Sequence, residues 1–357
     1  MTEPISRPIV RRFLRRPGRA LDAFALTAVV LAVILLALGN LRAADRDAQL
    51  RNVSYSTTGA LYRDLNAAYD RSCGELGASP VAVVQSHGGS ARQSRAILDG
   101  APADVATLAS FADVDALRKR GLLADGWSGR LPHHSVPYTS TVVFVVRKGN
   151  PRHIHEFADL VSQRAAVVVP NPKTSGDGKL SFLAAWGSVL HRGDTEEAAR
   201  AFVTALYAGV VSLDEGAREA SNRFVYDKVG DVLLTWESEA FDDVAEAKDD
   251  LEVVYPTASL LAEPCVAWVD ANVQRRGTGA LAKSYLEFLF TEPAQEIMAT
   301  HHYRPISPAV LERHRAEFPR VELFPIGILA ADWEDAQRRF FDDDGVFDAI
   351  VPRRAPK

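Results

Sequence analysis

The stretch VVQSHGGSARQSRAILDG, Val83 to Gly100, combines a short apolar run, two glycines, a serine and a helix-like pattern. This order predicts a strand, a turn at Gly88-Gly89 and a helix with Ser90 as N-cap, and Gln93 completes an S-x-x-Q capping box. A helix start presents unpaired N–H groups and the positive end of its dipole, and both favour an anion. The stretch therefore predicts an anion site, although an ordinary strand-to-helix turn has the same pattern.

The same arrangement of small residues between a strand and a helix recurs three times. The recurrences are Ser56-Thr57-Thr58 after the strand that ends at Ser54, Thr174-Ser175-Gly176 after the strand Val167 to Val169, and Gly216-Ala217 before another helix-like segment. Four such turns that face one cleft would form a single oxyanion site. Trp236 could add an indole N–H, which donates a hydrogen bond without bringing charge, although a tryptophan is more often part of a core.

The sequence does not support a nucleotide-phosphate, metal or calcium site, because the residue spacing does not match the motifs of these sites. In SGDGKLS, residues 175–181, the glycines are too close for a nucleotide phosphate loop and the lysine is followed by leucine. The histidine pairs 133–134 and 301–302 are adjacent and do not share a face, so neither predicts a metal site. Residues 342–345, DDDG, lack the alternate spacing and the terminal Glu of a calcium loop. We expect no metal and no cofactor.

A hydrolase is the alternative from another functional class. His87 lies beside Ser86 and Ser90 in sequence, and Ser175 is a further candidate nucleophile. A serine hydrolase needs a base that is oriented by a third group, and the sequence contains no G-x-S-x-G elbow. We therefore expect His87 to be structural and the protein not to be an enzyme.

Short β-branched runs alternate with amphipathic stretches after Asp45, which is typical of α/β architecture. The expected strands are Leu50 to Ser54, Val81 to Val84, Val105 to Leu108, Ser140 to Arg147, Ala166 to Val169, Val232 to Thr235, Glu252 to Tyr255 and Cys265 to Val269. The expected helices include Leu61 to Tyr69, Ala91 to Leu98, Leu180 to Leu190, Glu196 to Leu206 and Thr278 to Leu289.

The order of these elements predicts two lobes. Strand-like segments at residues 137–147 and 263–269 are expected to cross between the lobes and to act as hinges. Residues 45–136 and 264–357 would form the first lobe, and residues 137–263 the second. Ligands of such sheets bind at the carboxyl ends of strands, which here means the cleft between the lobes.

The amino terminus and the charge distribution restrict location and partners. Seven arginines, Glu3 and Asp22 give residues 1–44 a charge of +5, and an uncharged apolar run follows from Ala23 to Leu41. This segment is either a cleaved export signal or a retained membrane anchor, and both place the body outside the cytoplasm. The remaining residues carry −10, which makes nucleic acid an improbable partner. Cys73 and Cys265 form either a disulfide or two buried thiols.

Ten segments together resemble the periplasmic sulfate- and thiosulfate-binding proteins of bacterial ABC importers. They occur in order between about Gln49 and Ile350, and they are NVSY, QSHGGS, ADVATLA, LPHHSVPYTSTVVFVVRKGNP, PNPKTSG, LAAWG, GDVLLTWESEA, LAEP, YRP and LFPI. The resemblance implies a two-lobed type II periplasmic-binding-protein fold that closes on a dehydrated sulfate, a permease as membrane partner, and a monomer. It also implies neutral ligand donors, with no metal in contact. The implied donors are the backbone N–H groups of Ser56, Ser90, Gly176, Asp177 and Ala217, the hydroxyl of Ser175 and the indole of Trp236.

Two departures from the family pattern leave alternatives open. The family has Asp at the position of Ser56 and Gly at the position of Asp177. A carboxylate at Asp177 that faces the cleft would repel sulfate, but it could accept a hydrogen bond from a protonated oxyanion, so phosphate or molybdate is the alternative ligand. Lys179 or Arg92 could neutralise this carboxylate. A membrane-tethered sensor with the same fold is the third alternative.

Overall fold

The computed structural model describes residues 49–248 and 250–351. The predicted export signal or anchor, residues 1–44, lies outside the described residues. Within the described part of the chain, no helix has the length and apolar character needed to cross a membrane.

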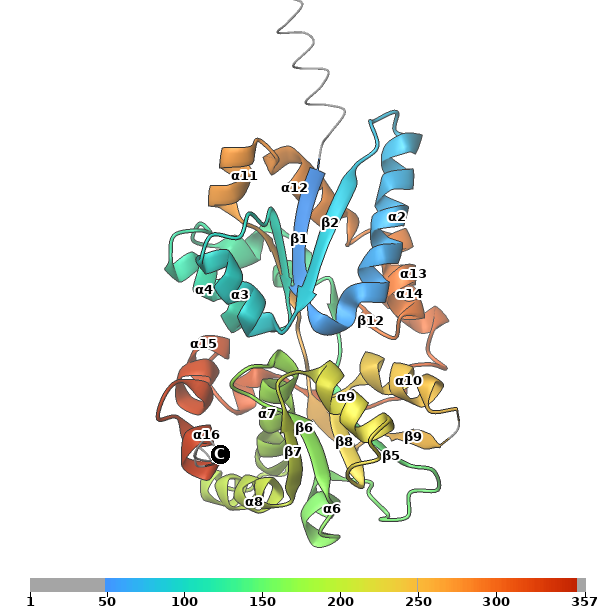
Figure 1. Ribbon diagram of the computed structural model, residues 1–357, viewed down its shortest axis with the longest axis vertical. Coiled ribbons are helices and arrows are strands. Elements are labelled where there is room, and N and C mark those ends of the chain that lie inside the picture. The colour runs from blue at the N-terminus through green and yellow to red at the C-terminus, as the bar shows by residue number, and fades with distance from the viewer. Residues whose placement is uncertain (1–48, 249, 352–357) are drawn as a thin grey trace, which may run out of the picture. The chain divides into compact units, whose positions relative to one another are not determined.

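The first lobe is built on a sheet with the strand order β11-β3-β1-β2. These strands are β1 (Gln49–Tyr55), β2 (Ala82–Gly88), β3 (Val105–Leu108) and β11 (Cys265–Trp268). The strand β1 pairs in parallel with β2 and β3, whereas β11 is antiparallel to β3. In the view of Figure 1, α2, α3, α4 and α11 to α14 surround this sheet. The carboxyl ends of the three parallel strands therefore lie on one edge of the sheet.

The second lobe is built on a sheet with the order β7-β6-β8-β5-β9. Its strands are β5 (Val142–Arg147), β6 (Val167–Pro170), β7 (Val210–Asp214), β8 (Val232–Trp236) and β9 (Leu251–Val254). The strand β6 is parallel to β7 and β8, and β5 is antiparallel to β8 and β9. The sequence VVFVVR of β5 is almost entirely buried, as expected for a central strand that is covered on both faces.

The helices are mostly short and amphipathic. Those of the first lobe are α2 (Gly59–Glu75), α3 (Ser90–Leu98), α4 (Phe111–Lys119), α5 (Pro132–Ser135), α11 (Asp270–Arg276), α12 (Gly279–Phe288), α13 (Glu292–Thr300) and α14 (Pro308–Arg313), with 3₁₀ turns η1 (Ser56–Thr58) and η2 (Trp127–Arg130). The others are α6 (Phe157–Ser162), α7 (Gly176–Leu190), α8 (Glu196–Ala208), α9 (Ala217–Val225), α10 (Glu237–Glu246), α15 (Trp333–Ala336) and α16 (Val346–Ile350), with η3 (Ile326–Ile328) and the π-helical turn η4 (Gln337–Phe341).

The two connections between the lobes lie side by side, near the predicted crossing segments 137–147 and 263–269, although most of the second segment is β11 of the first-lobe sheet. Ser140 and Ala262 form an antiparallel bridge at the point where both segments pass between the lobes. On one side of this bridge, β4 (Tyr138–Thr139) pairs with β12 (Arg304–Pro305) of the first lobe. On the other side, the chain continues into β5 of the second sheet. This pairing holds the two connections together at one position.

The carboxyl-terminal segment returns to the second lobe. The strand β13 (Glu322–Phe324) pairs with β10 (Ala258–Leu260), and the Phe324 ring packs so closely on α7 that a Cβ at Gly187 would lie 2.4 Å from it. The helices α15 and α16 also lie in the lower part of Figure 1. This placement differs from the predicted assignment of all residues 264–357 to the first lobe. The sequence did not reveal this placement, because it depends on the pairing of β10 with β13, which are distant along the chain.

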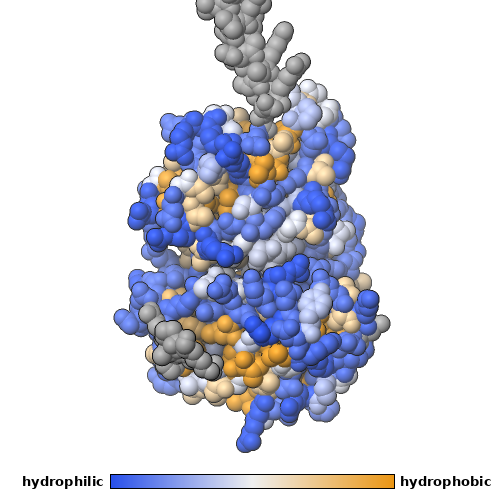
Figure 2. All heavy atoms as spheres, in the orientation of Figure 1, coloured by the Kyte–Doolittle hydropathy of each residue, from blue (hydrophilic) through white to orange (hydrophobic). Residues whose placement is uncertain are grey.

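The outer face in Figure 2 is mainly hydrophilic, including the boundary between the upper and lower lobes. Hydrophobic residues gather in the lower lobe on this face, around the region of β7, where Val211 is 54% exposed. The strand β7 was not among the predicted strands. Its polar Ser212 and Asp214 interrupt the apolar pattern that marked the others.

Candidate functional site

Four helix starts follow the carboxyl ends of parallel strands. The turn η1 follows β1 and α3 follows β2 in the first lobe, while α7 follows β6 and α9 follows β7 in the second. The first residues of a helix have no intrahelical acceptor for their N–H groups, so each start offers donors to an external group. The four turns predicted from sequence are therefore all strand-to-helix turns in the structure.

The starts of α3 and α7 approach each other across the two lobes. A Cβ at Gly176 would lie 2.8 Å from the Cβ of Ala109 and 3.4 Å from that of Ser90. A Cβ at Gly89 would lie 3.1 Å from the carbonyl oxygen of Thr174. These glycines allow the two backbones to come within van der Waals contact, so the lobes are closed on each other at this point.

The N-cap of α3 differs from the prediction. Gly89 is the N-cap, and Ser90 is the first helical residue. The Ser90 hydroxyl donates to Asp113 Oδ2 at 2.6 Å and accepts from the backbone N–H of Ala109 at 3.1 Å. The Gln93 amide lies 3.4 Å from the Ser54 carbonyl oxygen and does not complete a capping box. The predicted capping box was wrong because tertiary partners bind both side chains.

Asp113 connects the two lobes through a buried ion pair. Its Oδ1 lies 3.1 Å from Lys179 Nζ of α7, and both side chains are at most 8% exposed. Lys179, one of the two cations that could neutralise Asp177, is thus bound by Asp113 instead. No pattern in the sequence marks Asp113, since an acidic residue in the first turn of a helix is common.

Asp177 has a buried carboxyl group at the start of α7. Ser175 is the N-cap of this helix, and its Oγ lies 3.4 Å from both the Gly178 N–H and Asp177 Oδ2. The Asp177 side chain is 3% exposed, and its Oδ1 has no hydrogen-bond partner in the described part of the chain. Burial raises the pKa of Asp177 to about 7, since the carboxylate loses hydration, and the Ser175 hydroxyl offsets part of the rise. A large fraction of this carboxyl is therefore neutral near pH 7.

Trp236 supplies a buried donor that no described residue accepts. It is the last residue of β8, its side chain is fully buried, and its Nε1 lacks a hydrogen-bond partner within residues 49–248 and 250–351. Its ring centroid lies 5.5 Å from that of Tyr55, which directly precedes η1. An unpaired buried donor costs about 1–3 kcal/mol, so its presence indicates an external acceptor.

Two neighbouring hydroxyls are unpaired in the same way. Thr57 Oγ1 in η1 and Ser238 Oγ, two residues after Trp236, are buried and lack partners among the described residues. The first lobe and the second lobe thus each contribute unpaired polar atoms next to a predicted donor.

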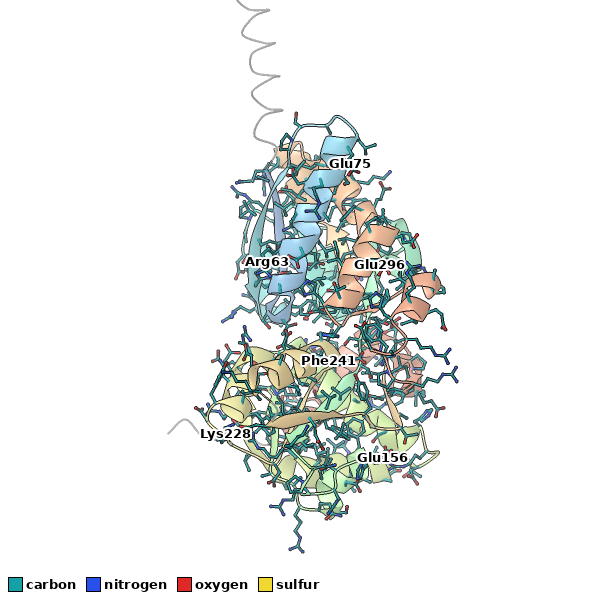
Figure 3. All side chains as sticks on the ribbon, turned by 90° about the vertical axis from the view of Figure 1, so that its right-hand side faces the viewer. Arg63, Glu75, Glu156, Lys228, Phe241 and Glu296 are labelled. Atoms are coloured by element: carbon teal, nitrogen blue, oxygen red, sulfur yellow. The ribbon has the colours of Figure 1, made fainter. Side chains whose placement is uncertain are left out.

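Further contacts on one side of the site join the lobes. Arg304 of β12 donates from Nε and Nη2 to the two carboxylate oxygens of Glu237 in α10, both at 2.7 Å. Burial raises the pKa of Glu237, and the guanidinium opposes that rise. Beside this pair, the rings of Phe241 and His302 stack at 4.0 Å, and Figure 3 shows Phe241 at the upper edge of the second lobe. These contacts join β12 and the segment after α13 in the first lobe to α10 in the second.

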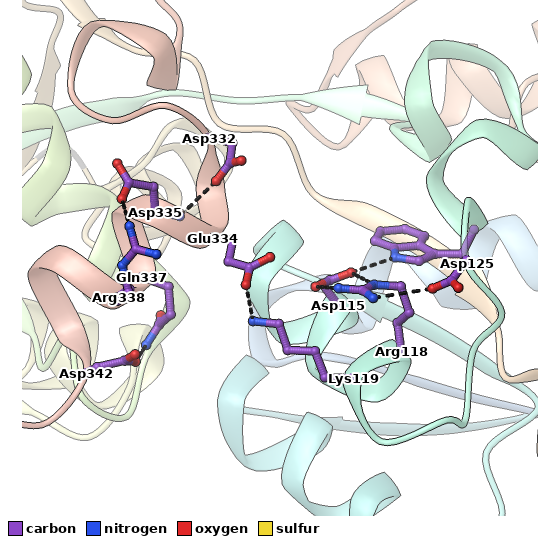
Figure 4. A network of polar contacts seen from close by, with 11 residues as sticks. Asp115, Arg118, Lys119, Asp125, Asp332, Glu334, Asp335, Gln337, Arg338 and Asp342 are labelled. Atoms are coloured by element: carbon purple, nitrogen blue, oxygen red, sulfur yellow. Dashed lines mark hydrogen bonds and ion pairs between the residues drawn. The ribbon is translucent and has the colours of Figure 1, made fainter.

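The side near the carboxyl terminus carries a different connection. Lys119 of α4 forms an ion pair with Glu334 of α15 at 2.9 Å, and Figure 4 shows this pair between two local networks. On the α4 side, Arg118 and Trp127 bind Asp115. The returning carboxyl-terminal segment therefore touches the first lobe as well.

A solvent-accessible pocket of about 500 Å³ opens between the lobes next to the helix starts. Its walls are formed by η1, the end of β2 with the first turn of α3, the turn before α7 and the start of α9, and its charged or titratable residues are His87, Arg92, Lys173, Glu215, Arg218 and Glu219. A Cβ at Gly216 would lie 2.7 Å from Glu219 Oε2, so the Glu219 carboxylate folds over the start of α9. The predicted Ser56 and the start at Ala217 border this entrance.

The serines considered for a hydrolase do not assemble with His87. His87 Nδ1 lies 2.7 Å from the hydroxyl of Ser54, and burial lowers the pKa of the imidazole. Ser90 is held by Asp113, and Ser175 caps α7.

Across the described ranges, no group of three His, Cys, Asp or Glu residues could hold a metal ion. Both cysteines are free and buried, which decides between the two predicted states.

Residues 50–304 match the family model for bacterial extracellular solute-binding proteins. The chain belongs to this family. Within it, the solute-binding protein is 44% identical over 310 residues to the sulfate-binding protein of Escherichia coli K12, covering 86% of this chain and 94% of the relative. It is 42% identical over 317 residues to the thiosulfate-binding protein of Pseudomonas aeruginosa, covering 88% of this chain and 95% of the relative.

A solved structure supports the same relationship. The sulfate-binding protein SubI of Mycobacterium tuberculosis H37Rv has a TM-score of 0.75 and 30% identity, covering 83% of this chain and all of that chain. A periplasmic thiamin-binding protein, at 20% identity and a TM-score of 0.62, shares the fold alone. The solute-binding protein thus has the predicted two-lobed type II periplasmic-binding-protein fold.

Proposed function

We propose that this solute-binding protein captures sulfate or thiosulfate outside the cytoplasm and delivers it to the permease of an ABC importer. The observation that carries the proposal is the fully buried, unpaired indole N–H of Trp236 beside helix starts from both lobes. Relatives that are 42–44% identical over most of the chain are named for these two oxyanions. Phosphate or molybdate is less favoured on the same comparison.

The proposed donors are neutral groups that are already oriented within each lobe. They are the backbone N–H groups of Ser56, Ser90, Gly176, Asp177 and Ala217, the Ser175 hydroxyl and the Trp236 indole. Removing water from a dianion is costly, so a pocket must replace the hydration shell with dipoles that need no rearrangement. Helix starts meet this need because their N–H groups are already oriented. A net charge of −10 after residue 44 means that these local dipoles, rather than long-range attraction, hold the anion.

The protein would act as a carrier and not as an enzyme. The lobes close around the ligand by bending at the paired segments near Ser140 and Ala262, and closure completes a donor set drawn from both lobes. The closed surface would then be recognised by the permease, with a monomer as the binding unit. An extracytoplasmic location agrees with the arginine-rich, apolar segment at the amino terminus.

Calorimetric titration of the purified protein tests the proposal. Sulfate and thiosulfate should each bind at one saturable site and compete with one another, while phosphate and molybdate should bind more weakly. Absence of binding by both sulfur oxyanions would refute the proposed ligand. Tighter binding of phosphate or molybdate would reassign the site within the family. A p-nitrophenyl ester and a p-nitrophenyl phosphate should show no turnover, and measurable turnover would refute the carrier role.

A further inference from the structure

Asp177 is a buried acid next to the proposed donors. Its own backbone N–H belongs to the donor set, and its Oδ2 lies 3.4 Å from the hydroxyl of Ser175. The side chain is 3% exposed, with Oδ1 unpaired in the described part of the chain. The ammonium group on the same helix, Lys179, is already bound by Asp113 at 3.1 Å. The carboxyl therefore lies at an anion site without an ion-pair partner of its own.

A second buried acid lies near Asp177. Glu239 in the first turn of α10 is 5% exposed, and its charge and that of Asp177 oppose each other. Glu239 therefore gives Asp177 no cationic partner. An ionised Asp177 beside a bound dianion would bring three negative charges together, and like charges repel strongly where water does not screen them.

We propose that the protein takes up one proton together with its oxyanion, so that the occupied site contains a neutral Asp177 carboxyl that donates its O–H to a ligand oxygen. The inference rests on the proposed function and deepens it. The proton comes from solvent, is returned to solvent on release, and no covalent bond changes. The unpaired oxygen of Asp177 thereby becomes an additional neutral donor, in line with the rest of the set.

The titrating behaviour of the surrounding groups agrees with this assignment. Burial raises the pKa of Asp177 to about 7, and burial together with neighbouring carboxylates raises the pKa of Glu239 well above its usual range. Asp177 and Asp243 are therefore the two acids of this region whose pKa is raised to about 7. Asp243, also with a pKa raised to about 7 by burial, accepts a hydrogen bond from Ser221 at 3.0 Å instead.

Other charged or titratable groups border this region from each packed element. They are Lys179 on α7, Arg218 on α9, Asp242 and Asp243 on α10, Tyr303 and the histidines His301 and His302 after α13, and His87 at the entrance. Burial lowers the pKa of His87 and of His302, whereas burial raises the pKa of Asp177. The shifts of the two histidines are therefore opposite in direction to that of the acid.

Sulfate affinity measured by calorimetry between pH 6 and 8.5 tests the inference, since sulfate has no titrating proton in this range. A group with a pKa of about 7 that must be protonated for binding predicts a Kd about 30-fold higher at pH 8.5 than at pH 6. Titrations at pH 8.5 in two buffers of different ionisation enthalpy should report uptake of nearly one proton per sulfate. Asp177→Asn keeps a neutral donor of similar shape, so its Kd should be nearly independent of pH, with no proton uptake.

Two variants serve as controls for the neighbouring groups. Asp243→Asn removes the other acid with a similar pKa, and His87→Gln removes the imidazole at the entrance. Both should keep the pH dependence of the parent protein. If either control variant abolished the pH dependence of the sulfate Kd while Asp177→Asn retained it, the proton would be assigned to the wrong residue and the inference would fail. A parent protein that binds sulfate with a constant Kd would also overturn the inference but leave the proposed function intact. Loss of sulfate binding at every pH in both parent and Asp177→Asn would instead defeat the proposed function.

A measurement without ligand gives an independent readout. Because the pKa of Asp177 is raised above its unfolded value, the folded protein binds more protons than the unfolded chain between about pH 4 and 7, and its stability falls as the pH rises through this window. Asp177→Asn should therefore raise the melting temperature more at pH 8 than at pH 5. An equal change at both values would contradict a buried, proton-carrying Asp177.

Discussion

Replacing Trp236 by Phe should separate ligand recognition from folding. The substitution keeps an aromatic ring at a fully buried position and removes the indole N–H, which has no partner in the described part of the chain. A hydrogen bond to a charged group contributes about 1.5–3 kcal/mol, so the sulfate Kd should rise about 10- to 150-fold.

The unliganded protein should respond differently. The smaller ring leaves a void that costs about 1 kcal/mol, while removal of an unpaired buried donor returns about 1–3 kcal/mol. The two contributions partly offset each other, so the free energy of unfolding without sulfate should stay the same or rise by up to about 2 kcal/mol. Calorimetry measures the first effect, and denaturation by guanidinium without sulfate measures the second.

Trp127 provides a matched control. It is also buried, but its Nε1 donates to Asp115 Oδ1 at 3.1 Å. Trp127→Phe should lower the free energy of unfolding by about 1–3 kcal/mol and leave the sulfate Kd unchanged. The reasoning would be refuted if Trp236→Phe kept the parent affinity, or if both variants lost the same stability and the same affinity.

Two further substitutions test the contacts between the lobes. Gly176→Ala inserts a methyl group where a Cβ would lie 2.8 Å from the facing lobe. Closure should therefore be hindered, and the sulfate Kd measured by calorimetry should rise at least about 10-fold. Gly129→Ala, where a Cβ would have no atom within 4 Å, should bind sulfate normally in the same titration. Equal affinities for the two variants would show that the close approach is not needed for binding. Glu237→Gln leaves the Arg304 guanidinium buried without its carboxylate, so the free energy of unfolding measured in urea should fall by about 3–5 kcal/mol. Glu287→Gln, in an exposed pair with Lys283, should lower it by only about 0–1 kcal/mol. A small loss at Glu237 would mean that water replaces the carboxylate and that the lobes open easily.

Local patterns allowed the sequence to predict much of the fold. Alternating apolar runs and amphipathic stretches marked most strands and the main helices, because these periods reflect which side chains of one segment are buried. The small residues at Ser56, Ser175 and Gly216 marked strand-to-helix turns for a similar reason, since a helix start has requirements that its own few residues meet. The donor positions implied by resemblance to the family remain a proposal that rests on this local geometry.

The partners of individual side chains required the tertiary structure. The Ser90 hydroxyl and the Lys179 ammonium both bind Asp113, which is 23 and 66 residues away, and no local pattern encodes those contacts. The return of β13 to β10 was missed for the same reason, as strand pairing joins residues that are distant along the chain. The charge of Asp177 depends on burial, and burial is a property of the packed lobes. The sequence by itself determined that an acid stands at this helix start, and only the fold removed the water that would keep it ionised.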